Sequence, residues 1–179
     1  MAGKKIILGV TASIAAYKSC DIINAFRRSG HEVRVVMSPD AARFITPLTL
    51  QALSGGRVVT DMFEPPDEWE ILHTSLGEWA DLIVIAPATA DMISKLACGR
   101  ADCVLSALVL ASRAKVLIAP AMNDRMYNHK ATRENIAKLK SFGCSFIGPA
   151  RGRLACGYKG VGHISEVKDI VLAARKLLR

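Results

Sequence analysis

The sequence has few aromatic residues and no hydrophobic run long enough to cross a membrane. Phe, Trp and Tyr make up 6% of its 179 residues, so aliphatic side chains must build the core. The apolar run after Lys4-Lys5 ends when Thr11 and Ser13 interrupt it. It is much shorter than the roughly 18 apolar residues of a membrane span and is also short for a signal peptide. We therefore expect one domain over residues 1–179 and no membrane partner.

Cysteine and histidine patterns typical of metal sites or disulfide frameworks are also missing. The five cysteines contain no CxxC spacing, and the four histidines form no HxxxH pair, so no metal site is predicted. An odd number of cysteines without a pairing pattern indicates free thiols, and we expect a cytoplasmic protein.

Positive charge is in excess but is not concentrated in any one segment. The formal net charge is +8, yet the basic residues occur in short pairs such as Lys4-Lys5 and Arg27-Arg28. No run of five basic residues or aromatic interleaving is present, so no nucleic-acid partner is predicted. A general positive field would instead help to capture an anionic small molecule.

Buried strands and helices alternate along the chain. Apolar runs predict strands at residues 5–10, 32–37, 81–86, 115–119 and 144–147, with a less regular one at 57–62. Strand–helix–strand units of this kind fold as right-handed parallel crossovers. We predict an α/β fold with three layers, Rossmann- or flavodoxin-like, in which a parallel sheet of five or six strands ends with the strand at 144–147.

The loops after these strands carry small and polar residues, and ligands bind at the carboxyl ends of strands in open α/β sheets. The turn 9–13 offers the hydroxyls of Thr11 and Ser13 at a helix N-terminus, which attracts phosphate. It is neither GxGxxG nor a P-loop, so the functional interpretation is a mononucleotide phosphate site and the alternative is an ordinary N-cap. Ser38 repeats the arrangement after the second strand, and residues 87–91 form another small loop.

The loop after the strand at 115–119 holds methionines on both sides of an asparagine. Asn123 can donate and accept hydrogen bonds at once, and Met122 or Met126 can pack on a flat ligand. A polar turn with two core methionines is the alternative, and this loop alone favours it.

Two further features stand apart from the strand–helix pattern. His73 opens a short helix, where a histidine is usually a cap or surface group but can also act as a general base near neutral pH. Residues 150–163 are rich in glycine and basic side chains and show no regular period, which is typical of a binding flap. A disordered connector is the alternative, although Leu154-Ala155-Cys156 in the middle argues against it.

Five motifs, in order along nearly the whole chain, resemble those of the homo-oligomeric flavin-containing cysteine decarboxylases. They are Gly9–Lys18, the histidine motif His73–Asp81, Ala86–Asp91, Pro120–Met126 and Leu154–Gly157. Within that family they look most like the branch that acts on 4′-phosphopantothenoyl-cysteine.

Three positions depart from the family pattern. Asp91 stands in place of asparagine, Tyr127 in place of tryptophan and His163 in place of arginine. Asp91 is expected to change a flavin or subunit contact, and the other two are expected to be tolerated.

The resemblance implies an FMN-dependent carboxy-lyase of coenzyme A biosynthesis. Such an enzyme converts 4′-phosphopantothenoyl-cysteine into 4′-phosphopantetheine through a thioaldehyde and an enethiolate. His73 would be the base of the oxidation step, Asn123 would hold the substrate carboxylate, and Cys156 would give the final proton. The implied cofactor-binding residues are Gly9, Thr11, Ser13, Ser38, Ala86, Pro87, Ala88 and Thr89. The implied substrate-binding residues are Met122, Asn123, Met126, Ala155 and Gly157.

The resemblance also implies partners. In the family the FMN site lies between the subunits of a trimer, and trimers can assemble further into a dodecamer; the apolar helix 103–112 is one expected contact. A phosphopantothenoylcysteine synthetase, fused or separate, is a further expected partner. Two alternatives stay open: a peptidyl-cysteine decarboxylase, which needs no donor like Cys156, and a non-catalytic flavin-binding regulatory subunit. The presence of both His73 and Cys156 argues against the latter.

Overall fold

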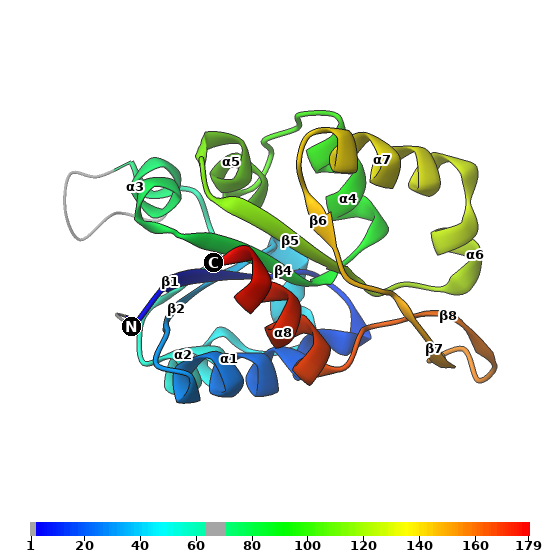
Figure 1. Ribbon diagram of the computed structural model, residues 1–179, viewed down its shortest axis with the longest axis horizontal. Coiled ribbons are helices and arrows are strands. Elements are labelled where there is room, and N and C mark those ends of the chain that lie inside the picture. The colour runs from blue at the N-terminus through cyan, green and yellow to red at the C-terminus, as the bar shows by residue number, and fades with distance from the viewer. Residues whose placement is uncertain (1–2, 64–70) are drawn as a thin grey trace.

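A parallel β-sheet forms the middle layer of the computed structural model, which describes residues 3–63 and 71–179. Its strand order is β3-β2-β1-β4-β5-β6 (Figure 1). The strands are β1 Lys5–Val10, β2 Glu32–Met37, β3 Val58–Val59, β4 Leu82–Ala88, β5 Lys115–Pro120 and β6 Ser145–Phe146. The predicted α/β fold with a parallel sheet is confirmed, and the strand predicted at 57–62 forms only as the two residues of β3.

Helices cover both faces of the sheet. One face packs against α1 Lys18–Arg28, α2 Pro47–Ser54 and α8 Val167–Leu177. The other packs against α3 Leu72–Trp79, α4 Ala90–Ala97, α5 Val104–Ala111 and α7 Lys130–Ser141 (Figure 1). The remaining helices are short: η1 Ile14–Tyr17 and η2 Pro39–Arg43 are 3-10 helices, and α6 Asp124–Asn128 follows β5.

The two cores follow from the alternation of side chains along the central strands. In β1, Ile6 and Leu8 face the α1 side, whereas Ile7 faces the α5 side. All three side chains are fully buried, because a parallel sheet with helices on both faces leaves no strand face for water. No helix in the described part of the chain is long and apolar enough to cross a membrane.

The helix expected at 103–112 forms as α5, and it is buried mainly within its own chain. Five of its residues, Val104 to Leu108, are buried, and Leu105 packs beneath β1. Leu110 is half exposed, so only the outer side of α5 is open to a partner.

A two-stranded antiparallel hairpin follows β6, which the sequence did not predict. It consists of β7 Ala150–Arg153 and β8 Lys159–His163 and lies beyond one end of the sheet (Figure 1). The prediction that the strand at 144–147 is the last one is therefore wrong. The hairpin strands contain glycine and basic residues rather than alternating apolar ones, so they lack the period that identifies a half-buried strand.

Candidate active site

A cavity of about 980 Å³ lies between the carboxyl ends of the central strands and the hairpin. Its walls come from the segments 11–17, 38–40, 89–95, 102–103, 121–126, 153–156 and 162–164. Strands β1 and β4 are neighbours where the chain reverses its order across the sheet, which is where open α/β sheets bind ligands. The volume lies in the range of natural small-molecule sites.

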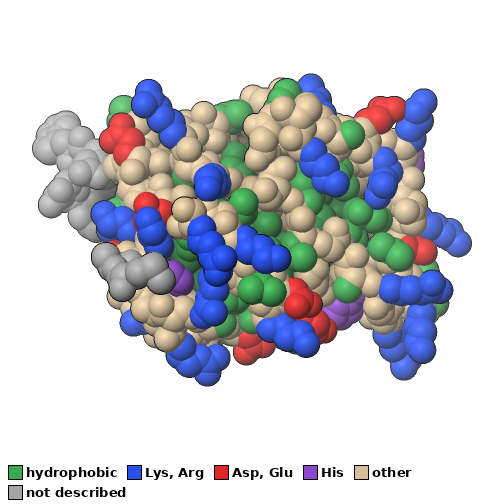
Figure 2. Space-filling view, viewed as in Figure 1, with side chains coloured by type: hydrophobic (Ala, Val, Ile, Leu, Met, Phe, Trp, Pro, Cys, Tyr) green, Lys and Arg blue, Asp and Glu red, His purple; other side chains and the backbone are tan. Residues whose placement is uncertain are grey.

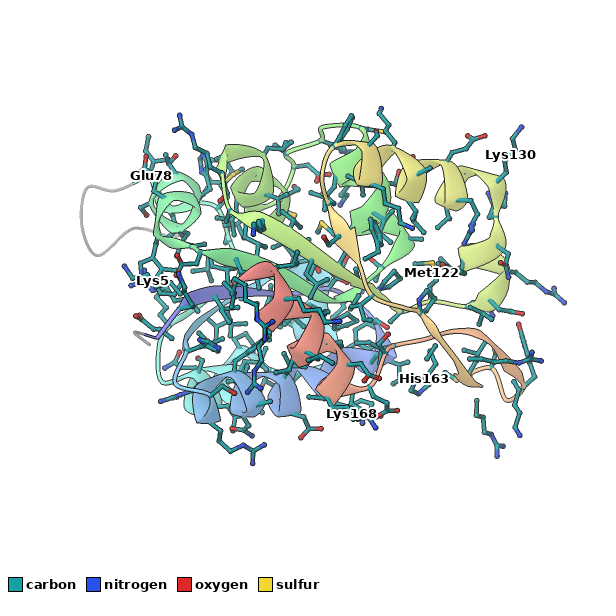
Figure 3. The ribbon with its side chains drawn as sticks, viewed as in Figure 1. Lys5, Glu78, Met122, Lys130, His163 and Lys168 are labelled. Carbon is teal, nitrogen blue, oxygen red and sulfur yellow. The ribbon has the colours of Figure 1, made fainter. Side chains whose placement is uncertain are left out.

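The cavity brings together most of the residues that the sequence analysis singled out. Predicted cofactor residues on its walls are Thr11, Ser13, Ser38 and Thr89, and predicted substrate or catalytic residues on its walls are Met122, Asn123, Met126, Ala155 and Cys156. Met122 and His163, labelled in Figure 3, come from the loop after β5 and from β8 and lie at the same end of the molecule.

Five predicted binding residues are absent from the walls of this cavity. Ala86, Pro87 and Ala88 are buried inside β4, and Gly157 lies in the turn of the hairpin. Gly9 serves packing instead, because a Cβ atom there would lie 2.7 Å from the Cδ1 atom of Leu105.

His73 is not part of this cavity. It is the second residue of α3 and is partly buried there. Helix α3 and the hairpin occupy opposite ends of the molecule (Figure 1). Within one chain, the imidazole is therefore separated from Asn123 and Cys156.

Thr11 holds two loops together at the floor of the cavity. Its hydroxyl donates a hydrogen bond to the Pro87 carbonyl at 2.7 Å and accepts one from the Thr89 backbone N–H at 3.0 Å. The residue is 1% exposed. The only hydroxyl proton of Thr11 is already donated to the Pro87 carbonyl. Thr11 therefore shapes the floor of the cavity and has no free donor for a phosphate, which differs from the interpretation of the sequence.

Replacing Thr11 with valine should destabilise the fold by about 2–3 kcal/mol, because it leaves the Pro87 carbonyl and the Thr89 N–H buried without their partner. Urea unfolding followed by circular dichroism measures this cost. Thr11→Ser, which keeps the hydroxyl, should retain most of the stability. Equal stability of the valine and serine variants would contradict the bridging role.

The turn after β1 presents unused backbone donors to the cavity. Ser13 is the N-cap of η1, and its hydroxyl accepts a hydrogen bond from the Ala15 N–H at 3.3 Å. In the described parts of the chain, no partner contacts the backbone N–H groups of Ala12 and Ile14. Two free N–H groups in a turn beside a polar cavity are suited to bind a phosphate.

Asn123 is oriented by the backbone of α6, for which it is the N-cap. Its Oδ1 atom accepts a hydrogen bond from the Arg125 N–H at 2.9 Å, which turns the Nδ2 group towards the hairpin. There Nδ2 lies 3.4 Å from the Sγ atom of Cys156 and 3.0 Å from the hydroxyl of Tyr158. The Asn123 amide is therefore one of the points at which the loop after β5 contacts the hairpin.

Tyr158 and Asp124 complete this contact, and the sequence analysis missed both. The Tyr158 hydroxyl donates to the Asp124 Oδ1 atom at 2.6 Å, and this hydrogen bond raises the pKa of Tyr158 above its ordinary value. No motif identifies such a pair, because the two residues are 34 positions apart and both lie in irregular sequence. Tyr158 thus fastens the tip of the hairpin to the start of α6.

Replacing Tyr158 with phenylalanine should loosen the hairpin tip without unfolding the domain, because it removes both hydroxyl contacts and leaves the ring. Hydrogen exchange of residues 154–159 should become faster, while exchange in β1 and β4 should not change. In the unchanged protein the same loosening should occur at high pH. The hydrogen bond between Tyr158 and Asp124 stabilises the hairpin tip fully below the ordinary tyrosine pKa of about 10. This stabilisation is lost as the pH rises through the raised pKa of Tyr158. Unchanged exchange at the tip would contradict the role of this hydroxyl.

A charged cluster forms another wall of the cavity. The Nζ atom of Lys95 lies 3.1 Å from Asp91 and 3.4 Å from Asp102, which also contacts Arg100 at 2.8 Å. Burial alone would lower the pKa of Lys95, but the hydrogen bonds and charges of the two carboxylates outweigh it and raise that pKa. Asp91, which departs from the motif pattern, therefore has a defined partner in Lys95.

Comparisons with known proteins find similarity over nearly the whole length of the chain. The family model described as Flavoprotein matches residues 1–179. The coenzyme A biosynthesis bifunctional protein CoaBC of Haemophilus influenzae is 46% identical over 171 residues, which cover 96% of this chain and 43% of the relative. The chain thus spans less than half the length of that relative.

Solved structures show the same similarity. A PPC decarboxylase, in which a cysteine is mutated to serine, complexed with pantothenoylaminoethenethiol, has a TM-score of 0.88 and 29% identity and covers 97% of each chain. The FMN-dependent cysteine decarboxylase SpaF has a TM-score of 0.81 and 30% identity, covering 97% of this chain and 98% of that chain.

Proposed function

The chain belongs to the Flavoprotein family, and from this premise we propose that it is an FMN-dependent carboxy-lyase that converts 4′-phosphopantothenoyl-cysteine into 4′-phosphopantetheine. The observation that carries the proposal is the meeting of the Asn123 amide and the Cys156 thiol, 3.4 Å apart, in the cavity at the sheet edge. The names of the relatives, a bifunctional protein of coenzyme A biosynthesis and a PPC decarboxylase, support it. The five cysteines are all free, which supports a cytoplasmic location.

The residues around the cavity fit FMN. The free N–H groups of Ala12 and Ile14, with Ser13 beside them, would hold its phosphate, and Ser38 and Thr89 line the adjoining wall. When bound, FMN supplies the two-electron oxidation of the substrate cysteine and returns these electrons at the end of the reaction. The protein supplies binding, orientation and protons.

Asn123 would bind the substrate carboxylate through its Nδ2 group. Because Oδ1 is held by the Arg125 N–H, the donor side of the amide faces the cavity without needing to rotate. A carboxylate that reaches Nδ2 replaces one of its two hairpin partners, Cys156 or Tyr158. Substrate entry and the position of the hairpin are therefore coupled at this amide.

Cys156 would donate the final proton from its Sγ atom to the carbon of the enethiolate that remains after CO₂ leaves. Cys156 lies at the tip of the hairpin, and its exposed thiol is on the wall of the cavity, where a substrate can reach it. The related PPC decarboxylase with a cysteine mutated to serine holds an enethiol, which is the species expected when a proton donor is missing. That complex supports an enethiol intermediate in the proposed reaction.

His73 would act as the base of the oxidation step in the cavity of a neighbouring copy. It does not line the cavity of its own chain, so a site with all three catalytic groups requires a second chain. The apolar side chains of Ile14 and Tyr17, 65% and 56% exposed at the rim of the cavity, support contact with such a copy. A homotrimer, or a larger assembly of trimers, would provide this arrangement.

Mixing two inactive variants should restore activity if the site is shared. His73→Asn and Cys156→Ser should each be inactive alone, whereas oligomers refolded or co-expressed from both should recover a substantial fraction of wild-type turnover, because some sites then combine an intact His73 with an intact Cys156. Turnover per flavin measures the recovery. Activity no higher than that of either variant alone, in oligomers shown to be mixed, would mean that one chain supplies both groups.

The function itself is tested by supplying FMN-loaded protein with 4′-phosphopantothenoyl-cysteine. Release of one CO₂ and formation of one 4′-phosphopantetheine per substrate is expected, measured by mass spectrometry. Turnover of a peptide with a carboxy-terminal cysteine and not of this substrate would favour a peptidyl-cysteine decarboxylase. Flavin binding without any turnover would favour a regulatory subunit.

A further inference from the structure

Three basic side chains share one face of the hairpin. In the antiparallel register Arg153 lies opposite Lys159, and Arg151 lies two residues before Arg153 on the same strand. Side chains two residues apart on a strand point to the same face, as do directly paired residues. All three are exposed, and Figure 2 shows Lys and Arg side chains over this end of the molecule as well as elsewhere on the same face.

This basic face, formed by Arg151, Arg153 and Lys159, has no counterion among the residues that the structure describes. Across residues 3–63 and 71–179, none of its three side chains lies within 4.0 Å of a carboxylate. The nearby Asp124 is engaged by the Tyr158 hydroxyl and by the Arg125 N–H. Three cations held together in this way repel one another, and an anion with several acceptor oxygens would relieve that repulsion.

The basic face continues directly from the candidate active site. Arg153 lines the cavity, as do Leu154, Ala155 and Cys156 beyond it. A strand rises about 3.3 Å per residue, so Arg153 and Arg151 lie at most about 10 Å and about 17 Å from Cys156 along the hairpin. A molecule with its reacting end at Cys156 and an extended arm along the hairpin would place a distal anion among these three side chains.

We propose that Arg151, Arg153 and Lys159 form a subsite for the terminal phosphate of the substrate. The hairpin would then contact both ends of the substrate, the cysteine end through Cys156 and the phosphate through the basic face. This inference rests on the proposed function, because the phosphate of 4′-phosphopantothenoyl-cysteine lies at the end of the pantothenoyl arm remote from the cysteine. The FMN phosphate has a separate place at the turn after β1. Arg153 at the cavity wall orients the phosphate, and Arg151 and Lys159 complete its coordination from the two strands.

The test compares the phosphorylated substrate with pantothenoyl-cysteine, which lacks only the phosphate, in FMN-loaded protein. In Arg151→Gln/Lys159→Gln the KM for the phosphorylated substrate should rise about 100-fold, because the variant removes two charge-assisted contacts to the phosphate, each worth about a factor of ten. The KM for pantothenoyl-cysteine should change less than twofold. Calorimetric titration with 4′-phosphopantetheine and pantetheine should show the same difference without turnover.

Arg113→Gln is the matched control, because it removes an exposed arginine before β5, at the opposite edge of the sheet. It should leave the preference for the phosphorylated substrate intact. Failure of the wild-type protein to process either substrate would refute the proposed function. Normal turnover with an unchanged KM ratio in the double variant would overturn the phosphate subsite alone. A loss of FMN but not riboflavin affinity in the double variant would assign the basic face to the cofactor phosphate and also overturn it.

Discussion

Replacing Cys156 with serine should lower the formation of 4′-phosphopantetheine by about 100- to 10,000-fold, the usual contribution of a positioned general acid. A serine hydroxyl fits the same space but is a far weaker acid than a thiol, so the carbon that loses CO₂ is not protonated at a useful rate. CO₂ should still be released, about once per active site, since Asn123 and the remaining cavity are intact. Rapid-quench mass spectrometry should show an enethiol in place of the saturated thiol.

The matched control for this experiment is Cys98→Ser. Cys98 is also an exposed free thiol, but it follows α4 and does not line the cavity. Its replacement should leave the rate of product formation within a factor of two of the wild type. If Cys156→Ser makes fully reduced product at the normal rate, the final proton comes from another group and the assignment of Cys156 fails.

Replacing Asn123 with aspartate should reduce kcat/KM by at least about 100-fold while the fold persists. Aspartate is as good an N-cap as asparagine, so the Oδ atom that accepts from the Arg125 N–H is retained. The donor group is lost, however, and a negative charge then faces the substrate carboxylate. Like charges placed together in a binding site cost several kcal/mol, so the loss should appear mainly as a raised KM.

The matched control adds the same charge to the same short helix. Asn128 is exposed at the end of α6, and Asn128→Asp should keep wild-type kinetics. FMN binding, followed by the flavin spectrum, should be normal in both variants because neither residue is hydrogen-bonded to the turn after β1. A wild-type KM in Asn123→Asp would exclude the amide as the carboxylate-binding group.

The parts of the fold that the sequence predicted are those in which burial dominates. The strands at 5–10 and 115–119 are almost entirely apolar and are buried from their second residue onwards, because helices cover both faces of the sheet. The hairpin was missed because its stability comes from pairing and from contacts of glycine backbone, neither of which leaves a hydrophobic period. The strand predicted at 57–62 is limited to Val58–Val59 in the structure, because only these two residues pair with β2.

The candidate site also has parts that the sequence predicted and parts that it did not. The loops after β1 and β5 were identifiable because topology places the carboxyl ends of parallel strands at one edge. The engagement of the Thr11 hydroxyl by Pro87 and Thr89 could not be foreseen, because these partners are 76 and 78 residues away. Nor can a sequence show that His73 lies outside the cavity of its own chain, since a motif identifies a residue type and not the subunit that uses it.

The close seating of the hairpin on the loop after β5 has a consequence for engineering. The Met122 N–H donates to the Gly162 carbonyl at 3.0 Å, a Cβ atom at Gly162 would collide with the Met122 carbonyl oxygen, and one at Gly160 would lie 2.9 Å from the Cβ atom of Asp124. A mutant library aimed at new substrates should therefore keep both glycines fixed and randomise the exposed positions 151, 153 and 159. Such a library would vary chemical selectivity while the contacts between the hairpin and the loop after β5 keep their geometry.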